Sequence, residues 1–269
     1  MSAMLQVTPG PSLFAAINSG PGLRAHRVHF GELPKPTRDH LVRAAESIRG
    51  RGGAGFPFAG KLKALGHSKR PVLVVNWAEG EPASHKDAAL ARVLPHLVLD
   101  GALLAARAYG VRSIHLVLPG EQDEVVASVR EAVAERPEAR RFKVHLAEDW
   151  FVAGQARAVL ELMAGRPNLP VTAWRPEVYD GFKGKPTLLS NAETWAQLAR
   201  CVLMPEAQAT TLLTFGGESG APNVSEVVLG SRFGDALPAN WSADVPVLVG
   251  GYHGVWTTVD SIADKRIDH

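Results

Sequence analysis

The stretch PVLVVN, residues 71–76, decides the fold. It is a brief, largely β-branched run bounded by polar residues, which is typical of a strand buried on both faces. Comparable runs follow at IHLVL (114–118) and FKVHLA (142–147), and helical patterns separate them. Strands that alternate with helices predict a parallel sheet covered on both faces. We therefore expect an α/β fold with a Rossmann-like parallel sheet.

Helical patterns lie around these strands. Thr37 is a suitable N-cap for the first of them, and Pro95 lies where a long pattern must break or restart. The expected helices cover residues 38–48, 60–65, 86–109 with an interruption at Pro95, 121–135, 155–164 and 187–203. Residues 1–35 are rich in Gly and Pro, and they predict an extended lead-in with a short strand around His26–Phe30.

The pattern changes after Pro205. Short apolar runs at 210–217, 225–230 and 245–251 alternate with Gly and Pro, which favours short strands joined by turns. We therefore expect a boundary near residue 205, with one domain over 1–204 and a smaller one over 205–269.

Composition limits the possible functions. The chain has 269 residues, of which 46% are hydrophobic and 21% charged, and a formal net charge of +2. This charge is too small and too evenly spread to favour nucleic-acid binding. No apolar run approaches the roughly 20 residues of a membrane-spanning helix, and no basic segment with an apolar core of about 7–15 residues begins the chain. We expect a soluble, cytoplasmic protein.

Cys201 is the only cysteine of the chain. A single cysteine excludes an intrachain disulfide and any cysteine-ligated zinc ion or iron–sulfur cluster held by this chain alone. Its apolar helical surroundings, WAQLARCVLM (195–204), indicate a buried structural thiol. His26 and His29 have no further metal ligand nearby in the sequence, so we expect no metal site there.

The segment RGRGGAGFPFAGK (49–61) places four glycines within six residues and flanks them with cations. Glycines permit positive φ and let backbone amides approach a ligand, and the helix expected to begin near Gly60 adds positive potential. The segment follows a helix instead of a strand and matches neither common nucleotide-binding motif. Two interpretations stay open, a cradle for phosphate or another anion and a glycine-rich surface turn.

A second segment, NWAEGEPASHKD (76–87), begins at the carboxyl end of the first predicted strand. Open α/β sheets bind their ligands at this edge. Asn76 offers donors and an acceptor suited to a heterocycle, and the carboxylates of Glu79 and Glu81 lie two residues apart. These carboxylates are either solvated charges or one wall of a site.

Together with GKPTLLSNAETWA (184–196), the two segments resemble the flavin-carrying, NADH-oxidising subunit of respiratory complex I and its relative in Rnf complexes. The three motifs occur in the same order as in that family and cover most of residues 47–200. Residues 209–251 resemble the β-grasp (SLBB-type) module that follows the flavin domain. The resemblance implies an FMN-binding α/β domain followed by a small β-grasp domain.

The resemblance also implies roles for the residues at matching positions. Those that match FMN-binding positions are Gly52, Gly53, Lys61, Asn76, Glu79, Gly154, Ser190, Asn191 and Thr194. Those that match dinucleotide-binding positions are Gly53, Phe56, Lys61 and Glu81. No catalytic acid, nucleophile or metal is implied, because flavin and nicotinamide carry the redox chemistry while the protein supplies alignment and electrostatics.

By this resemblance the chain is an NAD(P)H-oxidising FMN flavoprotein without an iron–sulfur cluster of its own. It would pass electrons to a partner protein, such as a ferredoxin or a membrane oxidoreductase subunit, or to a soluble acceptor. Phe151, Gln155 and Ala156 stand where the family has a tyrosine and two glutamates. The alternative is therefore a non-catalytic flavin- or nucleotide-binding subunit that docks in a redox complex.

Overall fold

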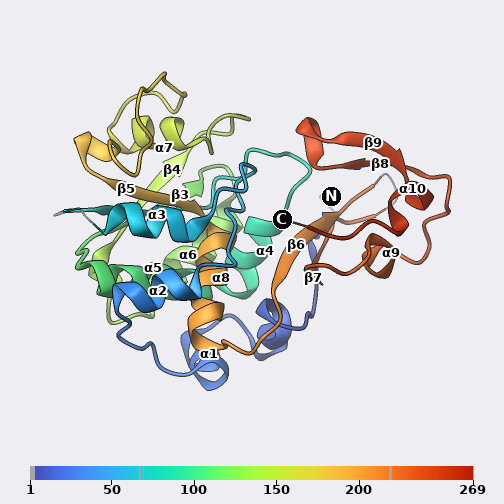
Figure 1. Cartoon of the computed structure of the whole chain (residues 1–269), viewed down its shortest axis with the longest axis horizontal. Helices are drawn as coiled ribbons and strands as arrows, with labels where there is room; N and C mark the ends of the chain where they lie inside the picture. Colours follow the sequence, from blue (N-terminus) through green and yellow to red (C-terminus); the bar gives the residue numbers. More distant parts are fainter. Residues whose placement is uncertain (1–3, 67, 69, 218–219, 269) are drawn as a thin grey trace.

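The computed structural model describes residues 4–66, 68, 70–217 and 220–268. Its central sheet has the strand order β4-β3-β2-β5, and all neighbouring strands are parallel (Figure 1). The strands are β2 (Val72–Asn76), β3 (Ile114–Pro119), β4 (Phe142–Ala147) and β5 (Thr187–Asn191). The expected α/β fold with a parallel sheet is confirmed. The three predicted strands lie within one residue of their expected bounds.

Helices cover both faces of this sheet, as Figure 1 shows, with α7 on one side and α5, α6 and α8 on the other. Alternate side chains of β2 enter two separate apolar clusters, one shared with α5 and α8 and the other with α7. Because both faces are buried, the strand is apolar up to Asn76 at its carboxyl end. The α-helices that precede residue 205 are α1 (Leu23–Phe30), α2 (Arg38–Ala44), α3 (Phe58–Leu65), α4 (Lys86–Val93), α5 (Pro95–Tyr109), α6 (Asp123–Ala134), α7 (Ala156–Met163) and α8 (Ala192–Leu203).

The single helix predicted over 187–203 is wrong in its first five residues. These residues form β5, whose backbone pairs with β2. Asn191 then caps α8, since its Oδ1 accepts a hydrogen bond from the Glu193 amide at 3.0 Å. In the sequence, the apolar residues just before Asn191 continue the helical pattern of α8. In the structure they are buried because they belong to the central sheet.

The extended lead-in predicted over residues 1–35 is also wrong, because this segment contains a 3-10 helix, η1 (Leu13–Ser19), and α1. The strand predicted around His26–Phe30 is the last part of α1. His26 and Phe30 are four residues apart, and both are buried on one face of the helix. A spacing of four positions brings side chains together on a helix and not on a strand. The interruption predicted at Pro95 is confirmed, since α4 ends at Val93 and α5 begins at Pro95.

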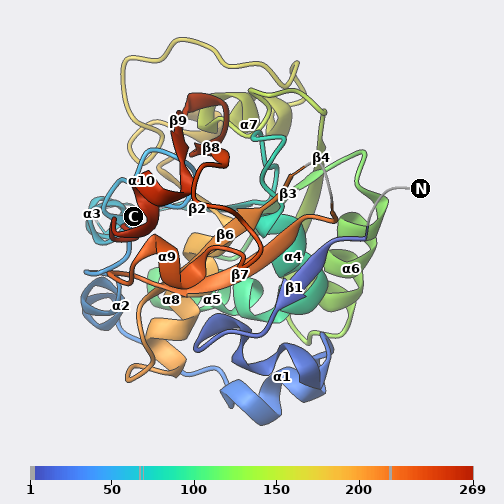
Figure 2. The same ribbon diagram turned by 90° about the vertical axis from the view of Figure 1, so that its right-hand side faces the viewer.

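The C-terminal region contains the predicted short strands. β6 (Thr210–Phe215) and β7 (Asn223–Val228) are antiparallel, and β1 (Gln6–Thr8) pairs in parallel with β7, so the sheet order is β1-β7-β6 (Figure 2). A separate hairpin pairs β8 (Pro246–Val249) with β9 (Val255–Thr258), and the turn between them contains a short 3-10 helix, η4 (Gly251–His253). The region also contains two short α-helices, α9 (Phe233–Ala236) and α10 (Val259–Ala263). The boundary at residue 205 and the β-grasp assignment stay predictions.

In the part of the chain that the structure describes, no single helix is long and apolar enough to cross a membrane. Helices α4 and α5 reach that length and composition only as a pair, and a bend of 93° separates them. The side chains of α5 are almost all buried in the core beside the sheet.

Candidate functional site

The three motifs meet at the carboxyl edge of the central sheet. Asn76 ends β2 and pairs with Asn191, which ends β5. The glycine loop (residues 49–57), although it precedes both strands, is fixed above α8 because the Arg51 amide donates to Thr194 Oγ1 at 3.0 Å. A Cβ atom placed on Gly52 would lie 3.7 Å from the Asn191 side chain. This is the edge where open α/β sheets bind ligands.

The glycine loop is closed at its base and open at its tip. The Gly50 amide donates to the Phe56 carbonyl at 2.9 Å, and the Phe58 amide donates to the Ile48 carbonyl at 3.0 Å. At the tip, Gly53 has φ of 95° and space on the side where a Cβ would stand. In the described part of the chain, no backbone acceptor lies in hydrogen-bonding geometry with the amides of residues 52, 53 and 55. Backbone amides exposed in this way form a nest suited to an anion.

Asn76 and Gly154 form one wall of the site together. The Asn76 side chain donates to the Gly154 carbonyl at 2.8 Å, and its Oδ1 accepts from the Ala78 amide at 3.1 Å. A Cβ on Gly154 would lie 2.2 Å from the Ala78 carbonyl oxygen, so only glycine permits this approach. Asn76 therefore joins the loop after β2 to the loop before α7 and keeps one further N–H for a ligand.

Lys61 lies on α3 beside β5. Its ammonium group donates to the Leu189 carbonyl at 3.1 Å and pairs with Glu177 Oε1 at 3.2 Å. The neighbouring Ser190 is buried in β5. An ammonium group has three donors, so Lys61 retains capacity for an anion next to the strand that ends at the site.

Phe56 is 53% exposed at the end of the glycine loop. Its ring lies against α3, where a Cβ on Gly60 would be 3.5 Å from the ring. The backbone on both sides is held by the bonds that close the loop, so the exposed aromatic face stays at the rim of the site. Such a face suits stacking with a planar heterocycle.

The two loop carboxylates have different partners. Glu79 turns inward, where it accepts from the Ser84 hydroxyl and, at 3.1 Å, from the Asp87 amide. Glu81 turns toward the C-terminal region, where its Oε2 accepts from the Tyr252 amide at 2.9 Å. They are therefore not a pair acting on one atom, and only Glu81 lies at the rim.

A buried ionic cluster lies beneath the site, and the sequence interpretation missed most of its members as functional residues. We call it the basal cluster, and it consists of Arg51, Glu79, Lys86, Asp87 and Glu193. Lys86 Nζ lies 2.9 Å from Asp87 Oδ1, 2.9 Å from Asn191 Oδ1 and 3.8 Å from Glu193 Oε2. Because Arg51 Nε lies 3.5 Å from Glu193, the cluster reaches from the glycine loop to the starts of α4 and α8.

Electrostatics in the basal cluster shift three pKa values upward. Burial alone would lower the pKa of Lys86, but the carboxylates of Asp87, Glu79 and Glu193 outweigh it and raise that pKa. Burial raises the pKa of Asp87 to about 7, against the opposing charge of Lys86. Burial also raises the pKa of Glu193. The sequence did indicate that Lys86, Asp87 and Glu193 are unusual, because they lie inside the motifs and in the first turns of otherwise largely apolar helices.

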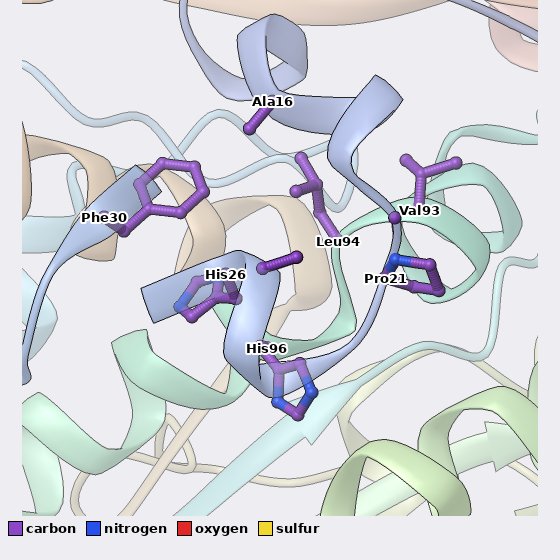
Figure 3. Close-up of a pocket in the computed structure, with 9 residues that line it drawn as sticks. Ala16, Pro21, His26, Phe30, Val93, Leu94 and His96 are labelled. Atoms are coloured by element: carbon purple, nitrogen blue, oxygen red, sulfur yellow. The ribbon is translucent and has the colours of Figure 1, made fainter. Parts of the chain in front are cut away.

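A cavity elsewhere in the fold is lined by His26 and His96, together with residues of α1 and the turn between α4 and α5 (Figure 3). Its volume is about 10 Å³, which holds one water molecule at most. His26 bonds to Asp100 at 2.7 Å, and Arg136 bridges Asp100 and His96. This buried network joins α1, α5 and the end of α6 and is structural. In the described residues, no group of three or more His, Cys, Asp or Glu side chains could hold a metal ion.

Known proteins give independent evidence. The family model described as the Nuo51 FMN-binding domain matches residues 43–200. The F 2 subunit of NADH-quinone oxidoreductase from Rhizobium meliloti is 29% identical over 216 residues, which cover 74% of this chain and 51% of that protein. The alpha subunit of the NAD-reducing hydrogenase HoxS of Cupriavidus necator is 26% identical over 247 residues, which cover 82% and 41%.

The fold has a close counterpart among solved structures. A chain of an air-oxidised NAD+-reducing nickel–iron hydrogenase superimposes with a TM-score of 0.82 at 24% identity, over 100% of this chain and 50% of that one. The chain thus spans about half the length of the relatives it matches. The family match includes the glycine loop, the carboxyl edge of the sheet and most of α8, and it covers more than half of the chain. The chain therefore belongs to the Nuo51 FMN-binding domain family, as its three motifs indicated.

Proposed function

We propose that this chain binds FMN at the carboxyl edge of the central sheet and oxidises NADH or NADPH there. FMN is the cofactor for which the family is named. One observation carries the proposal: the open amides of the glycine loop are fixed by Thr194 directly above the first turn of α8. Open amides and a helix N-terminus favour the same kind of ligand, an anion.

The residues present fit the cofactor. Gly53 stands at positive φ with free space beside it, so the backbone can approach a flat or anionic group there. Lys61 supplies a positive charge beside β5, and Asn76 keeps a free N–H at the end of β2. Ser190 and Asn191 end β5 beside them, and the Gly154 carbonyl accepts the Asn76 hydrogen bond. Glu79 lies in the loop after β2 and accepts from the Asp87 amide. Bound FMN would supply the two-electron redox chemistry.

The protein's own part is to bind and orient. Phe56 offers an exposed ring at the rim, and Glu81 offers a carboxylate on the side toward the C-terminal region. Gln155 and Ala156 at the start of α7 bring no carboxylate to this wall. We infer that electrons then leave for a partner protein or a soluble acceptor, because relatives of this chain are named as subunits of larger oxidoreductases.

Two spectroscopic measurements test the proposal. Protein purified or reconstituted with FMN should retain about one flavin per chain, and anaerobic NADH or NADPH should bleach the flavin absorption near neutral pH. Flavin that stays oxidised with both dinucleotides would replace the enzyme assignment with that of a flavin-binding docking subunit. Protein that retains no flavin would refute the proposal as a whole.

A further inference from the structure

The turn between β8 and β9, residues 250–254, is bonded to the loop that carries Glu81. The two segments are far apart in the sequence, yet the Tyr252 amide donates to Glu81 Oε2 at 2.9 Å. Figure 2 shows the β8–β9 hairpin beside the loop that leads from β2 to α4. The C-terminal region therefore touches the rim of the proposed site.

The turn is shaped for this contact. Gly251 has φ of 67°, and a Cβ placed on it would lie 2.3 Å from the Glu81 carboxyl carbon. A side chain at this position would displace the carboxylate, so glycine lets the backbone enclose it. The hydrogen bond of the Ala83 amide to Glu81 Oε1 at 3.4 Å completes the support on the other side. A carboxylate accepts about four hydrogen bonds, so capacity for a ligand remains.

Aromatic rings continue the same surface. The Phe151 ring lies 6.0 Å from the Tyr252 ring and 5.5 Å from the His253 ring, measured between centroids. Phe151 also packs tightly on the Glu81 loop, since a Cβ on Gly80 would lie 2.3 Å from its carbonyl oxygen. Tyr252 remains 69% exposed. The turn thus joins two walls of the site and presents a free aromatic face beside a fixed carboxylate.

We propose that the β8–β9 turn is a positioning element of the dinucleotide subsite, which holds the Glu81 carboxylate ready to accept hydrogen bonds from the dinucleotide. This inference rests on the proposed function and assigns the C-terminal region a part in it. A glutamate in an open loop loses rotamer freedom when it binds a ligand, and a carboxylate that is already fixed avoids most of that cost. The turn acts on the dinucleotide through Glu81.

The test is a double-mutant cycle on FMN-loaded protein with NAD+, which binds without reducing the flavin. One variant is Glu81→Ala, and the other replaces residues 250–254 by Asn-Gly, a two-residue turn that keeps a β-hairpin closed. We expect each change to weaken NAD+ binding about tenfold by calorimetry, and the combination to weaken it no further. Flavin content should be unchanged. Trp256→Ala, which alters an exposed residue of β9, is the matched control and should keep the wild-type dissociation constant.

Hydrogen exchange at the Tyr252 amide gives a second readout. Saturating NAD+ should leave this amide protected, because the turn stays on Glu81. Tighter NAD+ binding by the shortened turn, or loss of amide protection with NAD+, would overturn the proposal by showing that the turn competes with the dinucleotide. Unchanged affinity for NAD+ would overturn it as well, because the turn would then only make packing contacts with the Glu81 loop. If the shortened turn lowers the thermal stability, Gly251→Ala takes its place with the same expectation, because its Cβ would displace the Glu81 carboxylate and the backbone at φ of 67° disfavours a side chain.

Failure of the proposed function is visible separately. Wild-type protein that retains FMN but binds neither NAD+ nor NADH would refute dinucleotide use itself, and this inference with it. Wild-type protein that binds NAD+ while all turn variants behave like the control would refute only the role of the turn.

Discussion

Replacing Lys86 by methionine should destabilise the protein strongly. Lys86 Nζ lies within 3.8 Å of three carboxylates and is the cation that meets all of them, whereas Arg51 lies close only to Glu193. Removing one partner from a buried ion pair costs about 3–5 kcal/mol, because the remaining charges stay buried and unpaired. A domain's whole free energy of unfolding is about 5–15 kcal/mol. The loss would therefore take a large part of the stability.

The pH dependence of this loss identifies its cause. Burial already raises the pKa of Asp87 to about 7, and without Lys86 it should rise further. A carboxyl group whose pKa is higher in the folded than in the unfolded state binds its proton more tightly when folded, so its penalty grows as pH rises through that range. The deficit of Lys86→Met relative to wild type should be several kcal/mol at pH 8 and clearly smaller at pH 5.

Urea unfolding of both proteins at the two pH values measures the deficit. Lys63→Met is the matched control, because Lys63 is exposed on α3 and its loss should change the unfolding free energy by no more than about 0.5 kcal/mol. A deficit below about 1 kcal/mol at pH 8, or an equal deficit at both pH values, would show that the buried carboxylates do not depend on Lys86.

Three further predictions concern the loop, its anchor and the histidines. Gly53→Val places a β-branched residue at φ of 95°, so flavin retention should fall several-fold while far-UV circular dichroism is unchanged; full retention would contradict the cradle. Thr194→Val leaves the Arg51 amide without its acceptor, which should cost about 1–2 kcal/mol in thermal unfolding and loosen flavin binding; equal flavin affinity would mean that the anchor is dispensable. Burial lowers the pKa of His96 and of His115 to about 4. Between about pH 6.5 and pH 4 the unfolded chain therefore binds protons at these histidines that the folded protein does not, so the free energy of unfolding should fall with pH, by roughly 3 kcal/mol for each histidine below that range. A flat stability profile over that pH interval, measured by urea unfolding, would contradict their burial.

The parallel sheet was predictable because three of its strands are short apolar runs that are buried on both faces and separated by helical patterns. β5 was not, because TLLSN (187–191) runs directly into the pattern of α8 and only its pairing with β2 shows that it is a strand. β1 has three residues and no pattern of its own. Its partner β7 lies near the other end of the chain, so nothing local specifies it.

The candidate site divides in the same way. The glycine loop and the end of β2 could be placed from the sequence, because strand order puts ligand sites at carboxyl edges. The roles of Thr194 and Lys86 could not, because they depend on contacts between segments that only the folded sheet brings together. Thr194 matches a flavin-binding position of the family, yet its hydroxyl accepts from the loop's own backbone. Its contribution to a ligand is therefore made at least in part through the loop.

Buried polar contacts connect the two parts of the chain on either side of the boundary predicted near residue 205, although the sequence pattern changes there. The buried Glu193 carboxylate accepts from the Thr211 hydroxyl and from the Leu212 amide, both at 3.1 Å, and Arg51 donates to the Thr210 carbonyl at 3.3 Å. β6 is an edge strand of its sheet, so its outward-facing Leu212 amide has no partner on a further strand and is paired by Glu193 instead. Each side thus satisfies polar groups that would be costly to bury alone. The basal cluster beneath the glycine loop and the C-terminal sheet should therefore form and unfold together, which couples the shape of the proposed site to a region outside the matched family domain.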